Sequence, residues 1–180
     1  TGVQTCALPI FNTGGTFAVT PGVTTTTNNA ITTTGTTLKM NTGSAFTMAD
    51  GFTNTFSVNG AADLYAGTAG ISPTFNFEVT GTNGVSDQIS FSGAASFTNP
   101  GAVINITPTA PLTVGHSFTI ATAASGLDSA NTWTLGNGGV ATFGATAYGL
   151  SLVNTATGST ITVLSSAPNI AFYTGDQGTT

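Results

Sequence analysis

Side chains capable of catalysis are few and scattered in this 180-residue sequence. The carboxylates are Asp50, Asp63, Glu78, Asp87, Asp128 and Asp176. Because catalysis needs groups that converge, these acids could act together only if stacked strands brought them to one place. Polysaccharide lyases and hydrolases on β-helices would use such stacked carboxylates, often with Lys or Arg nearby, and the only basic residue here is Lys39. We therefore predict no catalytic residue and no enzymatic activity.

Metal and cofactor chemistry also lacks its usual ligands. The single histidine, His116, lies in a Gly-His-Ser turn before an expected strand, and Cys6 is the only cysteine. A structural metal site needs several ligands, and the Gly-Gly-x-Gly-x-Asp repeat of calcium-binding β-rolls does not occur. The sequence predicts no metal and no cofactor. We expect Asp50 and Asp87 to make hydrogen bonds within turns.

Ligand contacts are the remaining chemistry that the residue types allow. Exposed aromatic rings could stack on glycans, and the candidates are Tyr65, Trp133 and Tyr148, with a buried or capping Trp133 as the alternative. A flat row of threonines could bind ice, but the threonines of residues 24–27 and 32–37 are mostly consecutive. Consecutive side chains alternate between the two faces of a strand, so at most half of these hydroxyls share one side. The tracts indicate a hydroxyl-coated β surface.

The composition argues against several partners. One basic residue and a formal charge of -5 cannot neutralise a series of phosphates, so we expect binding neither to nucleic acids nor to anionic membranes. No uninterrupted apolar run reaches the ~18 residues that a membrane-spanning helix needs. Hydrophobic residues make up 39% of the chain, and 12 Phe residues among them could supply a core. With so few protonatable groups, we expect the stability to depend only weakly on pH.

The elements that must position these residues are short strands. Thr and Gly are common, residues that favour helices are scarce, and apolar residues alternate with polar ones. The alternation is clear at Phe56/Val58, Phe75/Phe77/Val79, Ile89/Phe91, Ile104/Ile106 and Phe118/Ile120. Turn signals such as Asp50-Gly51, Asn83-Gly84 and Asn137-Gly138-Gly139 separate the runs. The pattern predicts an all-β chain.

A weak internal repeat indicates how the strands assemble. Residues 37–40, 45–48 and 55–58 each carry apolar side chains at their second and fourth positions, which suits stacked rungs that cover one another. We predict a right-handed parallel β-helix or related β-solenoid, with a β-sandwich as the alternative. Residues 11–107 form rungs in this interpretation. Residues 108–166 form terminal rungs and a cap, because an open end would expose unpaired backbone.

A pattern of the same kind runs through the second half of the chain. It comprises Phe75-Asn76-Phe77-Glu78, Ser86 to Ala95, Val103 to Thr107, Leu112 to Ala123, and the strand pair Tyr148 to Asn154 and Ser159 to Val163. This pattern resembles the autotransporter-associated β-strand repeat proteins, large bacterial surface or secreted proteins with β-helical passenger regions. Residues 171–175 are similar to the aromatic-Gly lead into a further repeat, with Tyr173 where Trp is usual. The resemblance implies a scaffold or adhesin and carries over no catalytic residue.

Both ends of the sequence suggest a piece of a longer protein. Residues 1–10 resemble the translation of a sequencing adapter, and residues 167–180 have the character of a linker or the start of a further unit. We therefore expect a metagenomic fragment that is truncated at both ends.

The expected function is structural. The sequence favours a non-catalytic scaffold, stalk or adhesin segment of an extracellular or cell-surface bacterial protein, with glycans or a host or cell surface as partners. A glycan- or ice-binding solenoid is one alternative. Another is a subunit of an extracellular fibre that self-associates by strand addition at exposed edges.

Overall fold

The computed structural model describes residues 16–19, 24–26, 31–34, 37–40, 45–65, 72–98, 101–129 and 132–169. Within these residues the regular structure consists of 16 strands and one short 3-10 turn at Asn137–Gly139, with no α-helix. The all-β prediction is confirmed.

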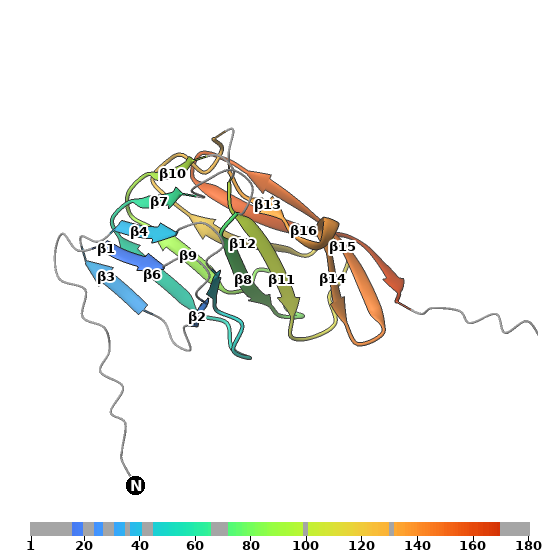
Figure 1. The fold of residues 1–180 in the computed structure, drawn as a ribbon. Coiled ribbons are helices and arrows are strands. Elements are labelled where there is room, and N and C mark those ends of the chain that lie inside the picture. Colours follow the sequence, from blue (N-terminus) through green and yellow to red (C-terminus); the bar gives the residue numbers. More distant parts are fainter. Residues whose placement is uncertain are drawn as a thin grey trace, which may run out of the picture.

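The strands form three sheets (Figure 1). The first sheet contains, in order, β1 (Thr16–Val19), β4 (Thr37–Met40), β7 (Ala62–Tyr65) and β10 (Ala95–Thr98). The second contains β13 (Thr134–Leu135), β11 (Val103–Pro108), β8 (Thr74–Val79), β5 (Ala45–Thr47) and β2 (Thr24–Thr26). The third contains β14 (Val140–Phe143), β15 (Thr146–Asn154), β16 (Gly158–Pro168), β12 (Ser117–Thr122), β9 (Gln88–Phe91), β6 (Thr55–Asn59) and β3 (Ile31–Thr34).

The chain visits the three sheets in rotation from β1 to β12. Three successive strands, which we call a triplet, contribute one strand to each sheet before the next triplet begins again in the first. Each strand therefore pairs with the strand three places away in the chain, and these pairings are parallel, as between β8 and both β5 and β11. This parallel pairing does not fit the antiparallel sheets of a β-sandwich.

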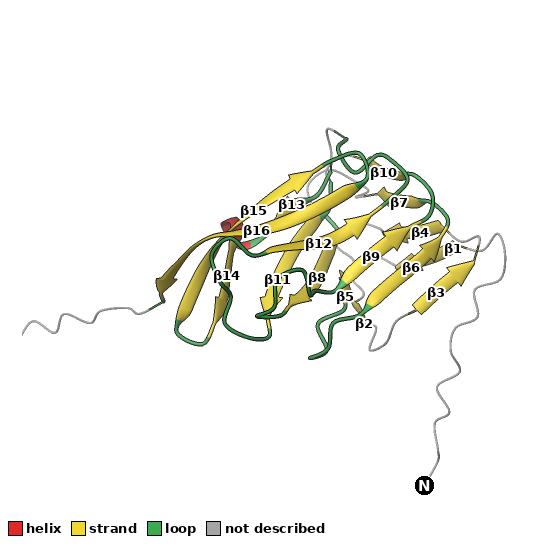
Figure 2. Cartoon of the chain, turned by 180° about the vertical axis from the view of Figure 1, so that it is seen from behind, coloured by secondary structure: helices red, strands yellow, loops and turns green. Residues whose placement is uncertain are grey.

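The strand direction changes after β13. Strand β15 pairs antiparallel with both β14 and β16, and β16 joins the third sheet by pairing antiparallel with β12 (Figure 2). The other edge of β12 stays parallel to β9, and the register with β16 shifts between Thr119 and Ala121, as at a β-bulge. These antiparallel strands begin at residue 140, inside the region that the sequence assigns to terminal rungs and a cap.

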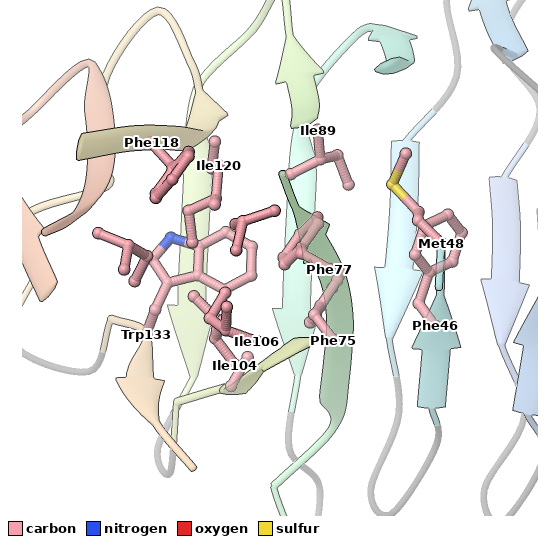
Figure 3. Packing of buried hydrophobic residues seen from close by; sticks show 14 of the residues in the cluster. Phe46, Met48, Phe75, Phe77, Ile89, Ile104, Ile106, Phe118, Ile120 and Trp133 are labelled. Carbon is pink, nitrogen blue, oxygen red and sulfur yellow. The ribbon is translucent and has the colours of Figure 1, made fainter. Parts of the chain in front are cut away.

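Register stacks the buried side chains in rows. Phe46, Phe75 and Ile104 are partners on neighbouring strands of the second sheet, and all three are fully buried. The rings of Phe46 and Phe56 lie 4.9 Å apart and link the second sheet to the third. Trp133 packs edge-on against Phe75 at 4.9 Å (Figure 3). Burial of each such aromatic side chain contributes about 1.5–3 kcal/mol, so these rows supply much of the stability.

Polar side chains on alternate positions also stack between triplets. The Asn105 amide nitrogen donates a hydrogen bond to the Asn76 amide oxygen at 3.0 Å, and the Thr122 hydroxyl donates to the Ser90 hydroxyl at 3.0 Å. Both pairs join strands that are register partners. Neighbouring strands are therefore tied by neutral side chains as well as by backbone pairing.

Candidate functional site

Two of the three predicted ligand-contact residues lie in the interior. Trp133 is 2% exposed and Tyr148 is 3% exposed, so neither ring presents a face on which a sugar could stack. Trp133 is enclosed because Phe75 and Phe97 both pack against it edge-on. This agrees with the alternative of a buried Trp133. The Tyr65 side chain lies outside the described part of the structure.

The single histidine does not meet a carboxylate in any described contact. His116 lies just before β12, where its backbone N–H donates to the carbonyl of Thr113, and the predicted turn is confirmed. Its ring is edge-on to Phe118 at 6.4 Å. The His116 Nδ1 atom is buried without a hydrogen-bond partner.

Several other candidates lie beyond the described side chains. Lys39 and Asp63 are register partners on β4 and β7, but only their backbone is described. The same holds for the strand residues within the threonine tracts 24–27 and 32–37, while Cys6 and Asp176 are outside the described residues altogether. In the described part of the second sheet, the row that continues Thr47 contains Asn76 and Asn105, so amides interrupt the hydroxyls that an ice-binding row would need.

Three of the six carboxylates do converge. Asp50 follows β5, Glu78 lies in β8 and Asp87 precedes β9, and the stacking of β8 on β5 brings them to one corner. Together with Gly51 and Asn54, they define the carboxylate corner. The expectation that acids could meet only through stacked strands is confirmed for Asp50 with Glu78 and is wrong for Glu78 with Asp87, which are nine residues apart in one loop.

Glu78, in the third triplet, holds the turn that follows β5 in the second triplet. Its side chain is 5% exposed, and Oε2 accepts hydrogen bonds from the backbone N–H groups of Asp50 at 3.1 Å and Gly51 at 2.8 Å. Gly51 has a φ of 93°, a left-handed conformation that glycine adopts without steric penalty. The turn can therefore aim two successive N–H groups at one carboxylate oxygen.

Asp87 makes a second link at the same corner. The residue is 0% exposed, and its two oxygens accept from the backbone N–H groups of Asn54 and Glu78, each at 2.7 Å. The Asp87 N–H in turn donates to the Glu78 carbonyl at 2.8 Å, which closes the 78–87 loop. The turn hydrogen bonds predicted for Asp87 are confirmed, and one of them reaches the preceding triplet.

Burial raises the pKa of Asp87 from 3.8 to about 6. The hydrogen bonds from the Glu78 and Asn54 N–H groups oppose this change, and the negative charges of Glu78 and Asp50 add to it. The expectation of only weak pH dependence is therefore corrected at this one position. Composition counts titratable groups but does not reveal which of them become buried.

A carboxyl group with a raised pKa beside other carboxylates is an arrangement found in general acid catalysis. Here, however, both oxygens of Asp87 are occupied by backbone donors and its side chain is shielded from solvent. Asp50 is partly buried: its Oδ1 accepts an exposed hydrogen bond from the Phe52 N–H at 2.9 Å, and its Oδ2 is buried without a hydrogen-bond partner. Among the described residues, no group of three or more His, Cys, Asp or Glu side chains could hold a metal ion.

An open hollow of about 470 Å³ lies between β11 and the segment that leads into β14. Its lining consists of Ile106, Thr107, Asn137, Val140, Ala141 and Thr142. None of these side chains is titratable, so the hollow offers no acid, base or nucleophile of the usual catalytic kinds. Sequence reasoning missed it because it arises from the packing of β14 beside β11, for which no local pattern exists.

Comparison with known proteins adds no identification: no protein-family model matches the chain, and no curated protein matches it. In the part of the chain that the structure describes, no helix has the length and apolar character needed to cross a membrane.

Proposed function

We propose that this chain is a non-catalytic structural segment of a secreted or surface-exposed bacterial protein, built as a right-handed parallel β-solenoid. The observation that carries the proposal is the rotation of strands among three sheets, with parallel pairing between strands three places apart. In this interpretation each triplet is one coil. Parallel connections are right-handed in about 98% of cases, which supports the handedness.

Such a segment would act by extending and spacing other parts of a protein. Backbone hydrogen bonds run between coils, and alternate apolar side chains fill the interior, so stiffness needs no charged surface. The Asn76–Asn105 and Ser90–Thr122 contacts add neutral links along the same direction. This agrees with a chain in which charged residues make up only 4%.

The antiparallel strands β14 to β16 would cap the stack. The backbone groups on the outer edge of β12 pair with β16, so the third sheet does not end in an open parallel edge at β12. Ile161 and Val163 of β16 are buried at 0% and 1% exposure and add to the core. A cap of this kind limits unwanted strand addition at that edge.

The resemblance to autotransporter-associated β-strand repeat proteins supports the extracellular placement and an adhesive contact with glycans or a cell surface as part of the same proposal. The pattern on which it rests includes β8, β9, β11 and β12, each of which pairs in parallel with a strand of a neighbouring triplet.

Incubation of the purified chain with a panel of polysaccharides tests the proposal. Reducing-end assays and mass spectrometry should detect no chain cleavage, and the Asp87→Asn variant should match the unmodified chain. Sugar release that disappears in Asp87→Asn but persists in Asp128→Asn would contradict the structural role, because Asp128 is an exposed carboxylate away from the corner.

A further inference from the structure

We propose that the carboxylate corner is a proton-responsive clasp: a proton bound by Asp87 tightens the contact between the second and third triplets, and its loss loosens that contact. The clasp would make this part of the molecule more resistant to opening in weakly acidic surroundings than in alkaline ones. This goes beyond the proposed scaffold function, which requires no response to pH.

The first argument is the charge balance of the corner. Three carboxylates meet there, and their described hydrogen bonds all come from backbone N–H groups, those of Asp50, Gly51, Phe52, Asn54 and Glu78. Backbone donors carry only partial charge, so they do not cancel three full negative charges in a partly desolvated place. One bound proton would remove one of these charges.

The second argument concerns a buried acceptor atom that has no hydrogen-bond donor. The Oδ2 atom of Asp50 is buried and has no hydrogen-bond partner. A protonated carboxyl group is both a donor and an acceptor, whereas an ionised one only accepts. A proton on Asp87 therefore adds a donor to a corner whose carboxylates otherwise only accept, and the raised pKa of Asp87 agrees with uptake near pH 6.

The third argument concerns the surroundings of Asp87. The negative charges that act on it are those of Glu78 in β8 and of Asp50 in the turn after β5. Strands β5, β6, β9, β11 and β12 contain no Asp, Glu, Lys, Arg or His. His116, in the turn before β12, has its ring against Phe118, and no described contact joins it to Asp87. The described residues therefore place no counter-charge at the corner.

The fourth argument concerns the hydrogen bonds between triplets that such a proton would affect. Asp87 bonds to Asn54 in one triplet and to Glu78 in the next, while Glu78 holds residues 50 and 51. Repulsion among the three carboxylates would act directly on these links. Opening would separate residues 50–54 from residues 78–87 and leave the buried Phe rows in place.

Amide hydrogen exchange of the whole chain, followed by NMR at pH 5 and pH 8 and corrected for the intrinsic exchange rate, tests the clasp. Protection of the Asn54 and Glu78 amides should be higher at pH 5 by up to about tenfold, which is the most that a pKa change from 3.8 to about 6 allows between these two pH values. The Ser117 amide, which is held by the neutral Asn83 side chain, should show no such difference. Equal protection of Asn54 and Glu78 at both pH values, or higher protection at pH 8, would overturn the proposal.

Three variants test whether the pH difference in protection arises from the carboxylate corner. Asp87→Asn should remove most of the pH difference at Asn54 and Glu78, Asp50→Asn should reduce it by less because burial is the main cause of the raised pKa of Asp87, and Asp128→Asn should leave it intact. If Asp87→Asn does not fold, Asp50→Asn decides, because Asp50 is only partly buried and Asn can still cap the Phe52 N–H. A pH difference that survives Asp50→Asn in full, or that disappears in Asp128→Asn, would contradict a proton held at this corner.

Discussion

The turn after β5 is held against the turn after β8 by carboxylates, whereas the turn after β8 is held against the turn after β11 by neutral groups. At the first corner Glu78 and Asp87 accept four backbone hydrogen bonds. At the second, the Asn83 amide oxygen accepts from the Ser117 N–H at 2.7 Å, and the Gln88 amide donates to the Thr119 carbonyl at 3.3 Å.

The comparison teaches that charged or neutral side chains can stabilise the same stacking of turns, but that the two kinds of contact differ in their sensitivity to pH. Hydrogen bonds to an ionised acceptor are stronger than neutral ones, and the burial that accompanies them penalises the charge. The carboxylate corner should therefore be the stronger and the more pH-dependent of the two. The neutral corner should be weaker and indifferent to pH.

The largest effect should come from removing the buried acceptor at the first corner. Asp87→Ala leaves the buried N–H group of Glu78 and the partly buried N–H group of Asn54 without their acceptor, so the free energy of unfolding at pH 6 should fall by about 2–4 kcal/mol. Urea denaturation followed by circular dichroism measures this. A loss below about 0.5 kcal/mol would mean that Asp87 does not hold the two triplets together.

The pH dependence should be the next largest effect. The pKa of Asp87 is about 6 in the folded chain and 3.8 ordinarily, so the folded chain binds this proton more tightly than the unfolded chain does. The stabilisation is fully present below about pH 4 and is lost as the pH rises through about 6. We expect the free energy of unfolding to fall by about 2–3 kcal/mol between pH 4 and pH 8, after correction for the other carboxylates with the Asp87→Asn variant.

Removal of the amide at the neutral corner should have a smaller effect. Asn83→Ala takes away the acceptor of the Ser117 N–H in an exposed turn, so the free energy of unfolding should fall by about 1 kcal/mol, equally at pH 5 and pH 8. Thermal denaturation at both pH values provides the measurement. A loss larger than that of Asp87→Ala would reverse the ranking of the two corners.

The smallest difference should be between the stability losses caused by alanine at the two turn glycines. Gly51 and Gly84 have φ values of 93° and 78°, and no atom lies within 4 Å of a Cβ added to either. Gly51→Ala and Gly84→Ala should each lower the free energy of unfolding by about 1 kcal/mol through backbone strain alone. Matched denaturation curves test whether the two turns share this backbone requirement; a gap above about 1 kcal/mol would show that they do not.

Much of the local structure was predictable from single residues and their spacing. The alternation Phe75/Phe77/Val79 specifies one buried face of a strand, and it lies in β8 with all three side chains at 0% exposure. The Asp50-Gly51 and Asn83-Gly84 signals lie in turns, and both glycines have positive φ. These features depend on local sterics and periodicity, which the sequence contains directly.

The partners across strands were harder to foresee. Alternation does not state whether a strand pairs in parallel or antiparallel. The local signal for the antiparallel β14 to β16 is instead the short length of their connections, residues 144–145 and 155–157. The meeting of Asp50 with Glu78 depends on the register of β5 against β8, and the raised pKa of Asp87 depends on the burial that follows. Tyr148 looked available on the sequence, yet it is buried in β15 opposite Ala141 of β14.

The central claim is that strands three places apart in the chain pair in parallel. Backbone NOEs in the isotope-labelled chain test it most directly, through the third-sheet partners Ser57, Ser90 and Thr122. The account predicts inter-strand NOEs that connect Ser57 to Ser90 and Ser90 to Thr122. NOEs that instead pair neighbouring strands in antiparallel register, such as β11 with β12, would contradict it.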